Sequence, residues 1–484
     1  MRINWFSPLP PAHTDIAHYT HRILRPLSEK AAIILWTDQS EWDPEIKTYA
    51  EVKRFTLGKF PWHAVNNAEI SFFHIGNNPL FHYSIWRLSR FHPGIVVLHD
   101  VVLQNLFAGI YWGVLKDTKA YVEQMKRFYG ESGEQEAMKA VQDRNVSPLI
   151  PHYPLTELAI ENALGVLVHN LDVYQQLKQK LACPVAYLPL PFDLSKYRIE
   201  RNKERGKAPP YRLIVFGYLG TNRCLDVLLK ALASFPQKDS FRLDIYGKLE
   251  EKWEIQALIS SLGLREKVTV HGFVPEQDLD SALSSAHLAI NMRYPTMGEA
   301  SGSQMRIWAH ALPSLVTKTG WFATLPSDTV AFVNPDSAIH DIHLHLSSFI
   351  EDPMKFDEMG RRGRLFLERN HLSETYAEGL IEFAKEVNER RSYATANYLV
   401  DRTAREITTL GDGQGLSARR VATEIAWVSN FFLNESDGNA ATEPLRPACT
   451  VKRLAHMCID LRYFLKKAMW KLRRVYTIYK RGHL

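Results

Sequence analysis

The chain has 484 residues, more than one ordinary hydrophobic core accommodates, so at least two domains are expected. Its hydrophobic content of 45% and charged content of 23% exclude an intrinsically disordered chain and are typical of a soluble globular protein. The net charge of +6 comes from the end of the chain: residues 451–484 contain ten Lys and Arg against one Asp, and residues 1–450 sum to −3. A nearly neutral body does not favour a nucleic-acid-binding surface, and no nucleic-acid partner is expected.

The four cysteines, Cys183, Cys224, Cys449 and Cys458, form no CxxC pair and no Cys/His cluster. Neither a disulfide framework nor a zinc site is therefore indicated, and we expect a reducing, cytoplasmic environment. The residues that follow Met1 are interpreted as a first strand and not as a signal peptide. No apolar run reaches the ~20 residues that a membrane-spanning helix requires.

Short apolar runs alternate with segments of helical period up to residue 391, a pattern typical of parallel βαβ units. The predicted strands are Ile3–Phe6, Ala31–Trp36, Ile70–His74, Ile95–His99, Val166–His169, Leu213–Gly217, Arg242–Tyr246, Val268–His271, Leu288–Asn291 and Ser314–Thr317. These strands predict an α/β fold with two doubly wound, Rossmann-like domains. The carboxyl ends of both sets of strands would open on the cleft between the domains.

The charged segment 192–210 ends in two prolines and lacks an apolar face, so it is interpreted as the interdomain linker. This places the first domain at residues 1–195 and the second at residues 208–391, closed by a long helix over 371–391. We expect residues 392–447 to form a helical and flexible linker and residues 448–484 to form a basic amphipathic helix.

The stretch Arg293–Arg306 (RYPTMGEASGSQMR) contains the clearest chemical signal in the chain. Ser301 and Gln304 have the spacing of a capping box, which predicts a helix that starts just after Ser301. The unpaired N–H groups of a helix N-terminus bind anions, and a diphosphate suits this site well. Glu299 stands just before the helix, where it would accept hydrogen bonds from sugar hydroxyls. From its spacing alone, it could equally cap or solvate the turn.

This stretch resembles the donor-binding motif of the family 4 glycosyltransferases, which have the GT-B fold and retain the anomeric configuration. Further matches occur in the family's usual order over roughly residues 1–391. They are SPLPPAHTDIAHY near the start, IVVLHD at 95–100, GVLVHN at 165–170, VFGYLGTNRCLDVLLKAL at 215–232 and VTVHGFVPEQDL at 268–279.

On the phosphate side, the resemblance implies backbone contacts from Ser301 and Gly302 to the donor diphosphate. It places Arg223, six residues after the strand-end glycine Gly217, as the cation that neutralises the leaving group without a metal. Arg293, also at a strand end, would add a second phosphate contact.

On the sugar side, the resemblance makes Glu299 the first glutamate of a Glu-x7-Glu pattern and His99 the active-site histidine. Three positions depart from the family. The second glutamate, which holds the donor ribose, is replaced by Ile307. Tyr218 stands where an arginine is usual, and residues 13–15 (HTD) replace paired glycines in the first loop.

The resemblance therefore implies a hexosyltransferase-type enzyme that moves a sugar from a nucleotide-sugar donor to a glycan or lipid-linked acceptor. The first domain would bind the acceptor and the second the donor, with neither cofactor nor metal, in a pathway such as polysaccharide biosynthesis. A non-catalytic sugar-nucleotide-binding protein and a scaffold that uses its C-terminal helix remain as alternatives.

On a helical wheel, residues 451–484 place an apolar stripe on one face and all ten basic residues outside it. Such a helix can lie in the interface of an anionic membrane, or it can pack on a protein. The membrane is favoured, because a docked helix does not need so much unrelieved positive charge. The protein is then expected on the cytoplasmic face of a membrane.

Overall fold

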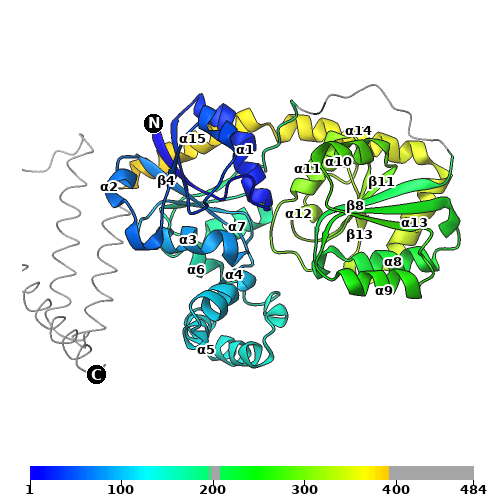
Figure 1. Ribbon diagram of the computed structural model, residues 1–484, viewed down its shortest axis with the longest axis horizontal. Helices are drawn as coiled ribbons and strands as arrows, with labels where there is room; N and C mark the ends of the chain where they lie inside the picture. The colour runs from blue at the N-terminus through cyan, green and yellow to red at the C-terminus, as the bar shows by residue number, and fades with distance from the viewer. Residues whose placement is uncertain (196, 198–207, 392–484) are drawn as a thin grey trace, which may run out of the picture. The chain divides into compact units, whose positions relative to one another are not determined.

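The computed structural model describes residues 1–195, 197 and 208–391, and all of them lie within one compact unit. Two parallel β-sheets, each covered by helices, form the two domains (Figure 1). The α/β fold with two Rossmann-like domains is thus confirmed. The predicted linker lies largely outside the described residues, and the predictions for residues 392–447 and 448–484 lie wholly outside them.

The first domain contains a seven-stranded sheet with the strand order β3-β2-β1-β4-β5-β6-β7, and all its pairs are parallel. Its strands are β1 (Arg2–Phe6), β2 (Ala32–Thr37), β3 (Glu51–Arg54), β4 (Ile70–Ile75), β5 (Ile95–Leu98), β6 (Gly165–Val168) and β7 (Val185–Tyr187). Its helices are α1 (Asp15–Ser28), α2 (Trp62–Val65), α3 (Pro79–Ser89), α4 (Gln104–Ala108), α5 (Thr118–Asp143), α6 (Thr156–Ile160) and α7 (Leu171–Lys180), with the short turns η1 (Pro44–Thr48), η2 (Leu57–Lys59), η3 (Gly109–Val114) and η4 (Ser147–Leu149). The central strands are buried on both faces, which explains why they read as continuous apolar runs.

The second domain contains a six-stranded parallel sheet with the order β10-β9-β8-β11-β12-β13. Its strands are β8 (Tyr211–Leu219), β9 (Phe241–Leu249), β10 (Val268–Gly272), β11 (Leu288–Asn291), β12 (Ser314–Thr317) and β13 (Ala331–Val333). Its helices are α8 (Leu225–Ser234), α9 (Lys252–Ser261), α10 (Glu276–Ser285), α11 (Gly302–Ala309), α12 (Gly320–Ala323), α13 (Ala338–Glu351) and α14 (Pro353–Asn370), with the turns η5 (Thr221–Arg223), η6 (Lys238–Ser240) and η7 (Pro335–Ser337).

Every strand predicted from the sequence is present to within two or three residues at its ends. Three observed strands, β3, β7 and β13, were not predicted, and all three are sheet edges. Strand β3 (EVKR) is charged, while β7 and β13 have only three residues each. Edge strands of this kind lack the apolar run that marks a buried strand. Among the described residues, no helix is long and apolar enough to cross a membrane.

The last described helix, α15 (Ser373–Glu389), differs from the prediction that a helix over 371–391 closes the second domain. It packs against α1 of the first domain instead, and the two helices lie side by side in Figure 1. The hydroxyl groups of Tyr19 and Tyr376 are 2.6 Å apart. The chain passes from the first domain to the second near Phe192 and returns to the first near His371. The two passages lie side by side, and Phe192 N–H donates to His371 O at 2.8 Å. An amphipathic pattern shows that a helix has an apolar face, but not which sheet that face covers.

Candidate functional site

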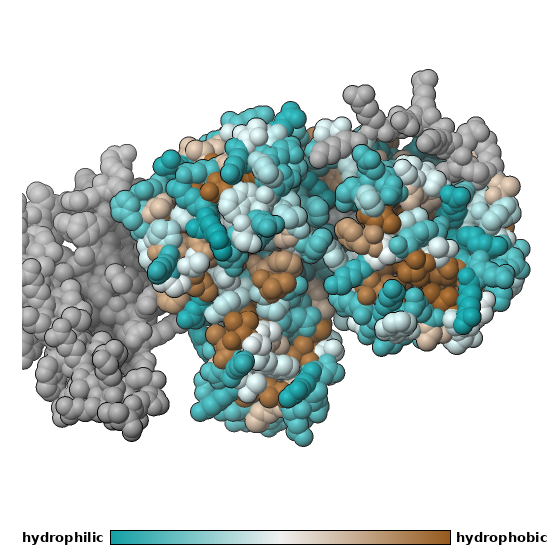
Figure 2. Space-filling view, viewed as in Figure 1, coloured by the Kyte–Doolittle hydropathy of each residue, from teal (hydrophilic) through white to brown (hydrophobic). Residues whose placement is uncertain are grey.

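The carboxyl ends of both sheets open on a cleft of about 1560 Å³. Residues of both domains line it, including His99 and Asp100 after β5, Arg223 after β8, and Arg293 and Glu299 after β11. The surface view shows a largely hydrophilic face that is hollowed where the two domains meet (Figure 2). The structure thus brings His99, Arg223, Arg293, Glu299 and Gly302 to one cavity, as predicted from the sequence.

Helix α11 begins at Gly302, directly after Ser301, as predicted. The Ser301 hydroxyl accepts a hydrogen bond from Gln304 N–H at 3.2 Å, so Ser301 is the N-cap. The reciprocal half of the predicted capping box is absent, because Gln304 Nε2 donates to Ser314 Oγ at 2.8 Å and Asn291 Nδ2 donates to Gln304 Oε1 at 3.0 Å. This buried network anchors the start of α11 to β11 and β12. The Ser301 side chain serves the helix, so any phosphate contact there would come from backbone N–H groups.

Arg223 and Gly217 form the second part of the predicted diphosphate site. A Cβ at Gly217 would lie 3.8 Å from Arg223 Nη2 and 3.7 Å from Ser303 Oγ, which places Gly217 between Arg223 and the first turn of α11. Arg223 is 8% exposed, and its guanidinium donates to Phe216 O at 3.1 Å without a carboxylate partner among the described residues. Burial, and then the charge of Arg293, lowers the pKa of Arg223 to about 9. A bound anion would relieve this uncompensated charge.

Glu299 is held by its own loop. Its carboxylate accepts hydrogen bonds from Met297 N–H at 2.7 Å and Thr296 Oγ1 at 3.2 Å, and it forms an ion pair with Arg293. Glu299 is 9% exposed and lines the cleft. An ionised carboxylate has about four acceptor positions, so one remains for a ligand hydroxyl after these three contacts.

Arg293, for which a second phosphate contact was predicted, forms an ion pair with Glu299. Burial alone would lower the pKa of Arg293, but the charge and hydrogen bond of Glu299 outweigh it and raise the pKa. The guanidinium is therefore neutralised by its own loop. Its Nε is buried without a hydrogen-bond partner among the described residues. Arg293 therefore orients Glu299, and its contact with phosphate stays a prediction.

The same loop ties the two domains together. Val101 N–H and Val102 N–H both donate to Met297 O, at 2.8 and 3.0 Å. Gly298 has φ of +81°, and a Cβ there would lie 2.8 Å from Val101 Cβ, so only glycine fits this approach. The loop that carries the candidate sugar-binding glutamate is thus also a contact between the domains.

His99 belongs to a group of four histidines: His74 in β4, His82 on α3, His99 after β5 and His169 after β6. His74, His82 and His169 are buried, and His99 is half-buried. His99 Nε2 and His74 Nδ1 are 3.0 Å apart, and the His99 and His169 rings have centroids 5.2 Å apart. Burial lowers the pKa of His82 and His169 to about 4 and that of His74 and His99 well below the usual range. The four side chains are therefore neutral at physiological pH and act as hydrogen-bonding groups.

Asp100, next to His99, was not assigned a role from the sequence. Its Oδ2 accepts a hydrogen bond from Asn77 N–H at 2.7 Å. Burial, and then the charge of Glu299, raises the pKa of Asp100 to about 7, although the Asn77 hydrogen bond and Arg293 oppose this. Asp100 therefore shares the electrostatic environment of Glu299 from the opposite domain.

Two further cleft residues, Arg22 and His169, were also missed. Arg22 lies on α1, where nothing in its local sequence separates it from an exposed helical arginine. For His169, the sequence did contain a signal. The pair His169-Asn170 follows β6 directly, just as the pair His99-Asp100 follows β5. Its Nδ1 lies 3.0 Å from Leu188 O, and its Nε2 is buried with no partner among the described residues.

The structure shows the surroundings of the three positions that depart from the family pattern. Ile307 is buried among apolar residues and offers no ribose acceptor. Tyr218 lines the cleft and is 37% exposed. In the first loop, Thr14 caps α1 through Ile16 N–H at 3.4 Å, and Asp15 lines the cleft.

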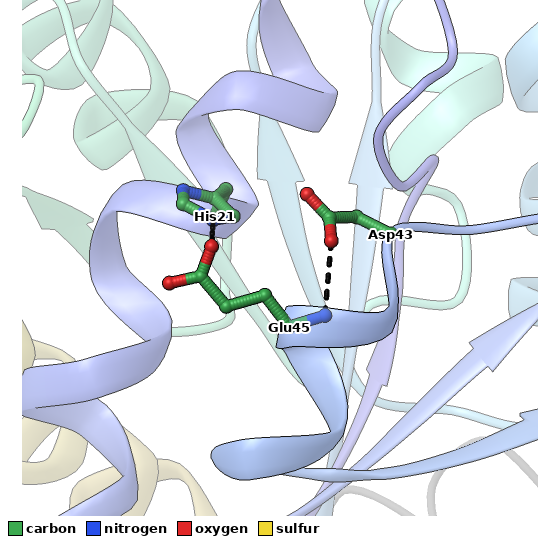
Figure 3. A group of neighbouring side chains, drawn as sticks. All are labelled: His21, Asp43 and Glu45. Carbon is green, nitrogen blue, oxygen red and sulfur yellow. Dashed lines mark hydrogen bonds and ion pairs between the residues drawn. The ribbon is translucent and has the colours of Figure 1, made fainter.

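His21, Asp43 and Glu45 form a group of metal-ligand type, away from the residues that line the cleft (Figure 3). Asp43 caps η1 by accepting a hydrogen bond from Glu45 N–H at 2.9 Å, and His21 Nε2 lies 3.8 Å from Glu45 Oε2. The cap and the ion pair account for this arrangement without a metal ion.

Comparison with known proteins finds a family match over part of the chain and solved structures of similar fold. Residues 197–366 match the family described as "Glycosyl transferases group 1". A search of curated proteins finds no match. Among solved structures, HepE of Anabaena in complex with UDP and glucose is 14% identical, with 80% of this chain and 100% of that chain covered and a TM-score of 0.56.

Two further structures have the same architecture. Sucrose-phosphate synthase of Thermosynechococcus elongatus is 14% identical, with 80% of this chain and 99% of that chain covered and a TM-score of 0.55. WaaG, a glycosyltransferase involved in lipopolysaccharide biosynthesis, is 15% identical, with 78% and 98% covered and a TM-score of 0.51. At these identities the likeness shows the fold, which is GT-B.

Proposed function

We propose that this chain, which carries a group 1 glycosyl transferase domain within a GT-B fold, transfers a sugar from a nucleotide-sugar donor with retention of configuration and without a metal ion. The single observation that carries this proposal is the set of chemical groups that line one cleft. They are the buried cation Arg223, which has no carboxylate partner among the described residues, the N-terminus of α11, the carboxylate of Glu299 and the neutral His99.

These two kinds of group match the two ends of a nucleotide sugar. The diphosphate is anionic and suits Arg223 and the α11 N–H groups, which offer fixed positive charge at a helix N-terminus. The sugar is neutral and rich in hydroxyl groups, which suit the remaining acceptor position of Glu299 and the uncharged His99. The bond that breaks, between the sugar C1 and the phosphate oxygen, would then lie where the two parts meet.

In the proposed reaction, an acceptor hydroxyl attacks C1 from the face that the diphosphate leaves. The C1–O bond to the acceptor forms, the C1–O bond to the phosphate breaks, and the hydroxyl proton passes to a departing phosphate oxygen. The contacts of Glu299 support this front-face route over a covalent intermediate, because Arg293, Met297 N–H and Thr296 engage the carboxylate and make it a weak nucleophile.

Metal independence is supported by the charge that the protein supplies. The leaving diphosphate needs positive charge in the transition state, and preorganised side chains and dipoles provide it without reorganisation. Arg223 meets this requirement because burial and its neighbours already fix it beside Gly217.

The donor base, the sugar and the acceptor are tested together. A thermal-shift screen of the full chain against UDP, GDP and ADP sugars identifies the donor, because a ligand of the folded state raises its stability. Release of nucleoside diphosphate is then measured with glycan and lipid-linked acceptors, with and without EDTA, and NMR gives the anomeric configuration of the product. We expect EDTA-insensitive turnover with retention.

The alternatives predict other outcomes. Binding of a nucleotide sugar without turnover on any acceptor would favour a non-catalytic binding protein. A strict requirement for Mn²⁺ or Mg²⁺ would contradict the metal-free assignment, and an inverted product would contradict retention.

The basic segment 451–484 supports a second part of the proposal, an association with anionic membranes at the cytoplasmic face. Its net charge of +9 would attract such a surface by up to ~1 kcal/mol for each basic residue near it. We expect the full chain, but not a 1–446 truncation, to co-sediment with phosphatidylglycerol vesicles, and high salt to weaken this binding. Equal sedimentation of both chains would remove the membrane assignment and favour the segment as a protein-docking helix.

A further inference from the structure

Arg22 is a cation in the cleft with no assigned role. It lies on α1 of the first domain and lines the cavity. Its guanidinium forms no ion pair with a carboxylate among the described residues. The groups that act on its charge are Tyr197, Asp15, Arg306 and Glu276. Burial is the largest influence and lowers the pKa of Arg22 below its usual value. Arg22 is half-buried, and a charge partly withdrawn from water is costly unless a ligand or a partner compensates it.

The other arginines around the cleft show why Arg22 is unusual. Arg293 is paired with Glu299, and Arg306 is paired with Asp280 at 2.8 Å. Among the described arginines that line the cleft, only Arg22 and Arg223 lack a carboxylate partner. They come from opposite domains.

The position of Arg22 relates it to the start of α11. A Cβ at Gly302 would lie 3.9 Å from Arg22 Nη1, and no other atom outside the chain neighbours approaches that point as closely. Gly302 is the first residue of α11, and its N–H is one of the groups that a helix leaves unpaired at this end. A phosphate oxygen bound at this N–H would be within reach of the guanidinium.

The Phe192 ring holds the guanidinium in place. The Arg22 Cζ lies 4.9 Å from the centroid of that ring. Stacking on an aromatic face leaves the edge of the guanidinium plane, with its N–H donors, free for an anion. Phe192 lies on the segment that crosses between the domains, where it pairs with Leu372 of the returning crossing.

We infer that Arg22 is a second cation of the diphosphate site, supplied by the first domain to the α11 N-terminus of the second. This inference rests on the proposed function. It also explains how the chain replaces the cation that is lost at Tyr218, since Tyr218 lines the same cavity. The complete diphosphate site then exists only when both domains contribute to it, so binding of the leaving group and the contact between the domains are coupled.

The test compares the binding of a nucleoside diphosphate with the binding of the nucleoside alone, which lacks the charged phosphates. The full chain and its Arg22→Gln, Arg22→Lys and Arg25→Gln variants are titrated with UDP and with uridine, and with the GDP and ADP pairs if uracil is not the base. Arg25→Gln is the matched control, because Arg25 lies on the same helix and is exposed. We expect Arg22→Gln to weaken diphosphate binding by ~10-fold or more, as for loss of a charge-assisted hydrogen bond, while nucleoside binding stays unchanged.

Arg22→Lys should recover only part of the affinity, because a lysine keeps the charge but not the stacked plane. Adding Tyr218→Arg to Arg22→Gln should restore diphosphate binding by returning a cation to the site. Diphosphate binding that is indifferent to Arg22→Gln, or an equal loss of diphosphate and nucleoside binding, would overturn the inference and leave the proposed function standing. No binding of any nucleoside diphosphate by the unmodified chain would overturn the proposed function, and the inference with it.

Discussion

The charged side chains of the cleft have different partners, and these partners decide their chemistry. Glu299 is oriented by three contacts from its own loop, whereas Arg223 has a single backbone acceptor and no counter-charge among the described residues. Glu299 is thus a fixed acceptor for hydroxyls, and Arg223 is a cation that favours an anion.

Glu299→Gln tests the first of these roles. The side chain keeps its size but loses the negative charge that pairs with Arg293, so its orientation toward the sugar weakens. We expect turnover to fall by ~100-fold or more, the scale of losing one preorganised polar contact. Glu251→Gln, at an exposed position outside the cleft lining, should leave turnover unchanged. Near-normal turnover in a folded Glu299→Gln protein would remove this residue from the mechanism.

The raised pKa of Asp100 makes the stability of the folded chain depend on pH, and it determines whether stability rises or falls with pH. The unfolded chain releases this proton near pH 4 and the folded chain at about 7, so between these values the folded state binds more protons. The contribution of Asp100 to stability is therefore greatest below pH 4 and is lost as pH rises to about 7. Above that pH its burial destabilises the fold.

Asp100→Asn removes this titration while keeping an oxygen that accepts from Asn77 N–H. We expect the variant to gain thermal stability relative to the unmodified chain at pH 8, and to gain much less at pH 5. Asp38→Asn, at an exposed position, serves as the control in the same melts. A difference between variant and parent that is equal at both pH values would contradict the raised pKa.

At the scale of elements, the cleft depends on how neighbouring strands end. Gly217 of β8 and Gly247 of β9 are paired in register, and both have φ of +112°, outside the range of most side chains. They differ in their surroundings. A Cβ at Gly247 would lie 2.0 Å from Gly217 O, a backbone atom, whereas a Cβ at Gly217 meets nothing closer than 3.7 Å.

Replacing each glycine by alanine should therefore distinguish two effects: the strain of an unfavourable φ, and the steric clash of a new Cβ with the backbone. Gly217→Ala should lower the free energy of unfolding by ~1–3 kcal/mol, the cost of an unfavourable φ. Gly247→Ala adds a backbone clash, and we expect a larger loss in melting temperature or no folded protein. Circular dichroism melts measure both. Equal stability of the two variants would show that the backbone clash at Gly247 adds no cost.

At the scale of the whole molecule, α15 makes the end of the described chain part of the first domain. Its buried side chains are Tyr376, Ala377, Leu380, Ile381, Phe383, Ala384 and Val387. All seven belong to a core cluster that contains residues of the first sheet and of the second domain. Val387 lies so close to Gly165 that a Cβ added at Gly165 would be 2.7 Å from Val387 Cγ2.

Removal of α15 should therefore unfold more than this one helix. Each large apolar side chain of α15 contributes about 1.5–3 kcal/mol by burial, and a typical domain has only ~5–15 kcal/mol of net stability. We expect a 1–391 chain to melt cooperatively and a 1–370 chain to be unfolded or rapidly degraded by protease. A 1–370 chain with the melting temperature of 1–391 would show that the first domain does not need this helix.

Much of this architecture follows from local sequence. Apolar runs and helical periods predict both Rossmann-like domains, because buried parallel strands need continuous apolar residues. The start of α11 follows from Ser301, since capping involves residues only three positions apart. The candidate residues Glu299, Arg223 and His99 follow from motifs that stand at the ends of predicted strands.

What only the tertiary structure decided involves residues that are distant in sequence. The association of α15 with α1 joins positions about 350 residues apart, and the approach of Arg22 to Gly302 joins positions about 280 apart. An amphipathic helix or an arginine has the same local pattern whichever surface it meets. Local sequence therefore determined the elements and their chemical groups. Packing between the domains decided which cations remain unpaired, because pairing and burial depend on every element around a charge.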